Sequence, residues 1–97
     1  MKRNEIKETV IKQEKRNVEG SVYDYSLIMS ESTGVASYRL PLYSIQIEMT
    51  DTEGNTTEAI SRDLFADVGK AVVFFRRLVD NLATPLNLPY ILEDEMQ

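Results

Sequence analysis

The chain has 97 residues, which is enough for one domain with one modest hydrophobic core. It contains no cysteine and no histidine. This composition excludes disulfides, zinc–thiolate sites, thiol catalysis and imidazole as a general base or metal ligand.

The net charge of −5 is unevenly distributed. Residues 1–16 carry six of the eleven Lys and Arg residues and net +3, whereas the remaining 81 residues net −8. An acidic body repels phosphate backbones, so we expect no nucleic-acid partner. The basic charges of residues 1–16 alternate with acidic and polar residues, which indicates a solvated strand face.

No segment predicts export or membrane insertion. The opening MKRNEIKE has no apolar stretch behind its charges, and the longest apolar run, Ala71–Phe75, is far shorter than the ~20 residues of a membrane span. With no cysteine, these features favour a bacterial, cytoplasmic protein and exclude a membrane partner.

Turn-forming residues at 19–21, 31–34 and 51–55 separate runs of β-branched and aromatic residues, as in hairpins. The first run, Glu8–Glu14, predicts a strand. A helix over Glu5–Arg16 is the alternative, supported by Glu8 and Lys12 at i,i+4. Its apolar stripe would be thin, so we favour the strand.

Two further segments, Val22–Ser30 and Tyr43–Thr50, alternate with a period of two. One face would be apolar and buried, and the other would be wet. Apolar positions change parity at Pro41, which predicts a bulge or a short loop there. Thr56–Ser61 reads as the return strand of a hairpin with Gly54 in its turn. The buried face would hold Tyr23, Tyr25, Leu27, Met29, Tyr43, Ile45, Ile47 and Met49, and the wet face Asp24, Ser26, Ser30, Ser44, Gln46, Glu48 and Thr50.

From Asp67 the apolar period changes to 3.6, which predicts a helix with Asp67 as N-cap or, alternatively, an earlier start at Asp63. Thr84-Pro85 would end it. A short second helix is expected after Asn87, with Pro89 in its first turn and Leu88, Ile91 and Leu92 buried. The first helix would bury Val68, Ala71, Val72, Phe75, Leu78, Val79 and Leu82.

These elements predict an α+β fold: a two-layer sandwich of a four-stranded antiparallel meander packed on one main C-terminal helix, plus a short terminal helix. One domain would span residues 1–97. Residues 1–7 would form a disordered arm and residues 93–97 an acidic tail.

The sequence predicts no catalytic residue, metal site or cofactor. The acidic run Glu93–Glu95 cannot converge on one ion from a helix, and residues 51–55 lack the spacing of a calcium loop. Asp63 and Asp67 lack a nucleophile partner and are interpreted as capping residues. Tyr23, Tyr25 and Tyr43 share the buried face, so a structural role is preferred to base stacking.

The main helix carries two apolar residues outside its core arc, Val73 and Phe74. Phe74 would pack under the terminal helix or, if exposed beside Arg77, anchor an interface. Tyr90, next to Pro89, is a second exposed candidate. The candidate interface residues are Phe74, Arg77 and Tyr90.

From Tyr43 onward the chain resembles a small clostridial domain family of unknown function. Members share a Y-G-I-E-I strand, a charged helix and an ending of the form T-P-x-x-L-x-x-x-x-E-D. Ser44 replaces the usual glycine, and the apolar run AVVFF replaces a charged helix. The resemblance implies no activity or cofactor, but the apolar run favours a partner surface. The matching residues are Tyr43, Ile45, Ile47, Leu78, Leu82, Thr84, Pro85, Leu88, Glu93 and Asp94.

The leading functional prediction is a small non-catalytic protein-interaction or regulatory module, with a homodimer or an unidentified protein as partner. The alternative is a small-ligand or metal-binding domain that uses carboxylates and tyrosines. A third hypothesis is an enzyme that uses Asp63, Asp67 or a tyrosine. A deep pocket would favour the last two hypotheses, and an exposed apolar patch the first.

Overall fold

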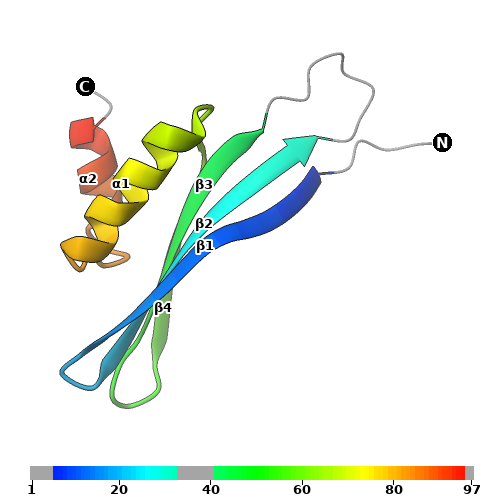
Figure 1. Cartoon of the computed structure of the whole chain (residues 1–97). Coiled ribbons are helices and arrows are strands. Elements are labelled where there is room, and N and C mark those ends of the chain that lie inside the picture. The colour runs from blue at the N-terminus through cyan, green and yellow to red at the C-terminus, as the bar shows by residue number, and fades with distance from the viewer. Residues whose placement is uncertain (1–5, 33–40, 96–97) are drawn as a thin grey trace.

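The computed structural model describes residues 6–32 and 41–95 (Figure 1). Four strands form one antiparallel sheet in the order β1-β2-β3-β4, and two C-terminal helices pack against it, which confirms the predicted α+β architecture. The molecule is elongated, with extents of 48 × 32 × 19 Å. The elements are β1 (Ile6–Val18), β2 (Ser21–Ser32), β3 (Leu42–Thr50), β4 (Thr56–Phe65), α1 (Val68–Asp80) and α2 (Leu88–Glu95).

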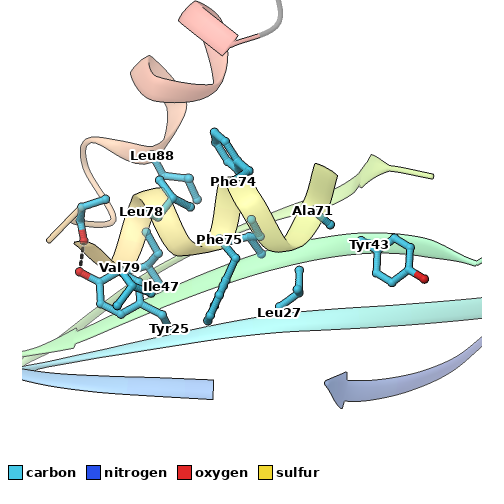
Figure 2. Close-up of a cluster of buried hydrophobic side chains, with 12 residues drawn as sticks. Tyr25, Leu27, Tyr43, Ile47, Ala71, Phe74, Phe75, Leu78, Val79 and Leu88 are labelled. Atoms are coloured by element: carbon cyan, nitrogen blue, oxygen red, sulfur yellow. Dashed lines mark hydrogen bonds between the residues drawn. The ribbon is translucent and has the colours of Figure 1, made fainter. Parts of the chain in front are cut away.

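The core lies between one sheet face and α1. Side chains of β2 and β3 alternate as the sequence predicts, and the register pairs Tyr25 with Ile47 and Leu27 with Ile45. All four side chains are fully buried. Figure 2 shows Phe75 pointing from α1 toward these strands. Because paired residues face the same way, the apolar sets of both strands meet the helix together.

Several element boundaries differ from the prediction. The first segment is a strand, as favoured, but it starts at Ile6, so it includes two residues of the predicted arm. β4 continues to Phe65 instead of Ser61, and α2 includes the acidic residues 93–95. The predicted turn at 31–34 is wrong for Glu31 and Ser32, which belong to β2. Residues 1–5, 33–34 and 96–97, together with Tyr38 and Leu40, lie outside the described residues.

Both hairpin tips are glycine turns. Glu19 and Gly20 have φ of 51° and 90°, as expected for a two-residue hairpin loop with positive φ at both positions. Gly54 has φ of 88°, which confirms its predicted turn role. Asp51 Oδ1 accepts hydrogen bonds from the backbone N–H groups of Glu53 and Asn55, each at 2.9 Å. These bonds hold the pKa of Asp51 below its usual value, with the Asn55 N–H as the largest cause.

Each edge strand contains a register shift. In β1 it falls between Val10 and Lys12, and in the β3–β4 pair between Tyr43 and Ile45. Asp63 lies in the second shift with φ of 56°, and its N–H donates to Ser44 Oγ at 2.9 Å. The predicted earlier helix start at Asp63 is therefore wrong. The expectation that Ser44 faces water is also wrong, since Ser44 is fully buried.

Asp67 caps α1 as predicted, because its Oδ1 accepts from Gly69 N at 3.2 Å. The helix ends in a Schellman motif: Leu82 N donates to Val79 O, and the next N–H donates to Leu78 O. Leu82 has φ of 52° and lies outside the helix. The predicted core arc is wrong at Leu82 and Val68, which are both exposed, and it omits Phe74, which is buried.

Candidate interface on the helical layer

The helical layer consists of α1, α2 and the connecting residues 81–87. One buried hydrogen bond fixes its connection to the sheet: Tyr25 Oη donates to Ala83 O at 2.8 Å. The dashed line in Figure 2 marks this bond. Burial raises the pKa of Tyr25 to about 12, with a smaller contribution from Tyr23. Tyr25 therefore stays protonated and anchors the start of the connection between the helices.

A reciprocal cap positions α2. Thr84 Oγ1 accepts from Asn87 N at 3.2 Å, and Asn87 Oδ1 accepts from Thr84 Oγ1 at 2.8 Å. Pro85 follows Thr84 directly and lies in the turn that precedes α2. Leu88 then faces the core and is fully buried, and Ile91 and Leu92 pack against that core as partly buried residues. The predicted second helix is confirmed.

The structure corrects the interface reading of Phe74. Its side chain is only 2% exposed, and its ring lies 5.5 Å from the ring of Phe65, centroid to centroid. Figure 2 shows Phe74 on the side of α1 away from the strands, where the second helix covers it. The alternative of packing under the terminal helix is therefore the observed one, because α2 extends the core around α1. Phe74 supports the helical layer from within.

Arg77 lies on the surface, as an interface residue requires. Its Nη1 donates to Glu95 Oε1 at 2.8 Å, which joins α1 to the end of α2. Both side chains stay partly in water, so this ion pair orients the guanidinium but stabilises the fold only slightly. Arg77 and Phe74 line the same groove.

Tyr90 is 72% exposed, in agreement with an interface position. Two further residues join the candidate set: Val73 is 60% exposed and Leu86 is 75% exposed. Sequence reasoning placed Val73 outside the core arc but did not assign it to the interface, and it missed Leu86. No helical period marks Leu86, because this residue lies in the connection before α2 begins at Leu88.

A shallow groove of about 690 Å³ runs along the flank of α1. Its walls come from three places: α1, the last residues of β4 and the end of α2. Aromatic and aliphatic side chains dominate the walls, and charged residues stand at the ends. It is lined by Leu64, Phe65, Asp67, Gly69, Lys70, Val73, Phe74, Arg77 and Glu95.

The residues named for the enzymatic alternative have different structural settings. Asp63 lies in the β4 bulge, Asp67 caps α1, and the hydroxyl of Tyr25 is engaged by Ala83. Within residues 6–32 and 41–95, no three carboxylates form a group that could hold a metal ion. A polar depression of about 210 Å³ on the other sheet face is lined by Gln13, Asp24, Ser26, Gln46 and Glu48.

The fold and this surface define a small α+β domain whose four-stranded antiparallel meander carries two C-terminal helices. No helix within the described ranges is long and apolar enough to cross a membrane. The chain belongs to the family of unknown function DUF6514, whose model matches residues 1–97. No curated protein and no solved structure matches it.

Proposed function

We propose that the chain is a non-catalytic protein-interaction module that binds its partner through the helical layer. One observation carries the proposal: the three most exposed large apolar side chains of the described residues, Val73, Leu86 and Tyr90, all lie in this layer. Exposed apolar side chains that are concentrated in one layer of a fold favour contact with another protein.

The sheet supports the proposal by contrast. Its exposed apolar residues are less accessible, at 53% for Val10 and 40% for Ile60, and they alternate with polar side chains that bond to one another. Gln13 donates to Asp24 at 2.9 Å, and Gln46 donates to Glu58 at 3.1 Å. Cross-strand hydrogen bonds thus engage polar side chains of the open sheet face, whereas the helical layer exposes the most accessible apolar side chains of the described residues.

Site-specific photocrosslinking in cells of the source organism tests the proposal. A photoreactive phenylalanine analogue at position 73 or 90 should yield one protein adduct, identified by mass spectrometry, from both positions. The same analogue at Ile60, on the open sheet face, is the matched control and should not yield that adduct. No protein adduct from position 73 or 90, or equal adducts from position 60, would refute the proposal.

Two expectations from the sequence accompany this proposal. We propose a cytoplasmic location, on the basis of the acidic, cysteine-free composition, and a clostridial origin, on the basis of the resemblance of the C-terminal half. The partner would then meet the module in a reducing compartment, where contact depends on apolar packing and ion pairs and not on disulfides.

A further inference from the structure

We propose that the partner of the α1 groove is a second copy of this chain. In this dimer the two α1 helices would run antiparallel about a two-fold axis that passes close to Val73. The inference rests on the proposed function, because it names the partner of the same helical layer. Its support comes from the shape of the groove, the order of its charges and the state of the sheet edges.

The groove offers both halves of a self-complementary contact. Val73 projects into solvent from the outer side of α1, and the apolar hollow beside it is lined by Leu64, Phe65 and Phe74. A two-fold interface uses the same patch on both copies. With the axis near Val73, the valine of each chain would enter the hollow of the other, and both projections would be buried.

The charges of the groove have the order that an antiparallel arrangement needs. Asp67 and Lys70 line the part of the groove that α1's first residues form, and Arg77 and Glu95 line the part nearer its last turn. Antiparallel packing would bring Lys70 of one copy to Glu95 of the other. It would also bring Asp67 near the opposite Arg77.

Parallel packing lacks this complementarity. It would place Lys70 beside Lys70 of the other chain, and Glu95 beside Glu95 of the other chain. Like charges in contact disfavour association. Gly69 also lines the groove, one helical turn before Val73, and carries no side chain that would keep the other helix away there. The charge order therefore selects one dimer geometry, with two equivalent sets of opposite charges around an apolar centre.

The sheet edges are less suited to self-association. The exposed edge strand β1 carries Lys7, Lys12 and Lys15 and is interrupted by its register shift after Val10. Lysines and bulges are features by which proteins prevent edge-to-edge pairing. In β4 the register shift around Asp63 interrupts the other edge in the same way. The helical layer is thus the better surface for a second copy.

A single introduced cysteine tests the geometry directly, because the chain has none of its own. A residue near a two-fold axis meets its own copy, so Val73→Cys should form an interchain disulfide under mild oxidation. Val68→Cys is the matched control: the residue is also exposed and also on α1, but it does not line the groove. Equal crosslinking of the two variants, or none at position 73, overturns the proposal.

The mass in solution tests the assembly. Light scattering of the full chain should give twice 11.1 kDa. Val73→Glu should raise the dissociation constant at least tenfold, whereas Val68→Glu should leave it within twofold. Circular dichroism should show both variants folded, since both side chains are exposed.

A charge exchange tests the antiparallel order. Lys70→Glu or Glu95→Lys alone should weaken the dimer, and the double variant should be tighter than either single variant. A chain that stays at 11.1 kDa at high concentration refutes the dimer. The proposed function survives that result if position 73 still crosslinks to a different protein, and it fails as well if no protein adduct forms.

Discussion

The two faces of the sheet are stabilised in different ways. The face under α1 buries a continuous cluster that includes Tyr25, Leu27, Ile45 and Ile47. The open face relies on cross-strand polar pairs, such as the 3.2 Å hydrogen bond between the hydroxyls of Thr50 and Thr56. The difference shows that strand alternation decides which side receives a helix, because a one-residue shift would exchange the two sets.

The open face nevertheless contains a small buried region. Ile28 is 7% exposed, its partner Ser44 is fully buried, and the two residues are paired in the register. Beside them Arg62 Nη1 donates to Glu8 Oε2 at 2.6 Å, although these residues lie on opposite edge strands. Three strand spacings amount to about 14 Å, so the two long side chains of this ion pair reach toward each other across the open face of the sheet.

The largest expected effect concerns the face under the helix. Phe75→Ala should lower the free energy of unfolding by about 3–5 kcal/mol, since it leaves a cavity between α1 and the sheet. Urea unfolding followed by circular dichroism measures the loss. Ile60→Ala on the open face is the control and should cost less than about 1 kcal/mol. Equal losses would remove the energetic distinction between the two faces.

The buried region of the open face should respond more than its surroundings. Ile28→Ala should cost about 2–5 kcal/mol, as expected for a buried isoleucine. Its cross-strand neighbour Val10 is more than half exposed, so Val10→Ala should cost less than about 1 kcal/mol. If both variants have the same urea midpoint, the burial of Ile28 contributes no more to stability than the exposed position of Val10.

The sequence predicts the features that depend on neighbouring residues but not those that depend on residues distant in the chain. Local periodicity predicts the strand faces, the Asp67 cap and the Gly54 turn, since each depends on residues close in the chain. The burial of Ser44 and Phe74 depends on residues distant in the sequence. Ser44 Oγ accepts a hydrogen bond from the backbone N–H of Asp63, which lies in the β4 bulge. Phe74 is covered by α2. No period within β3 or α1 contains that information.

The candidate interface was predictable only in part. The helical period alone left Val73 and Arg77 outside the core, and the structure finds both on the surface. Phe74 is close to both in the sequence but is buried. The helical period of α1 could not predict this burial, because it contains no information about where α2 packs. The groove itself combines residues from β4, α1 and α2, so only the tertiary fold brings it together.

A third prediction concerns the bond between the two layers. Tyr25→Phe should cost about 1–3 kcal/mol, since it removes the hydroxyl that bonds to Ala83 O and leaves a buried carbonyl unpaired. The hydrogen-bond contribution should also depend on pH. Burial raises the folded-state pKa of Tyr25 to about 12, from the ordinary value of 10.0.

The sign follows from proton linkage. Between the unfolded-state and folded-state pKa values, the unfolded Tyr25 has lost its proton while the folded Tyr25 keeps it, so rising pH favours unfolding. The stability contributed by this group is complete below about pH 10 and declines toward about pH 12. Unfolding midpoints of wild type and Tyr25→Phe should therefore converge over that range. A constant difference would mean that Tyr25 does not titrate abnormally.

The smallest effect is expected at the hairpin tips, which lie beyond the contact of sheet and helices (Figure 1). Gly54→Val should cost about 1 kcal/mol, because its φ of 88° penalises a side chain, while a Cβ there would meet no atom within 4 Å. Gly20→Val should cost more. A Cβ at Gly20 would lie 2.8 Å from Thr52 Cγ2 of the neighbouring tip, so it adds a clash to the same strain.

Thermal unfolding of the two variants, each compared with wild type, measures these costs. Gly54→Val reports backbone strain alone, whereas Gly20→Val also reports whether the two hairpin tips touch. Shortening the Thr52 side chain by Thr52→Gly in the Gly20→Val background should recover part of the Gly20→Val loss, because it removes the methyl group that the new side chain meets. The same change in the Gly54→Val background should recover nothing. If Thr52→Gly changes the melting temperature equally in both backgrounds, the two hairpin tips do not contact each other.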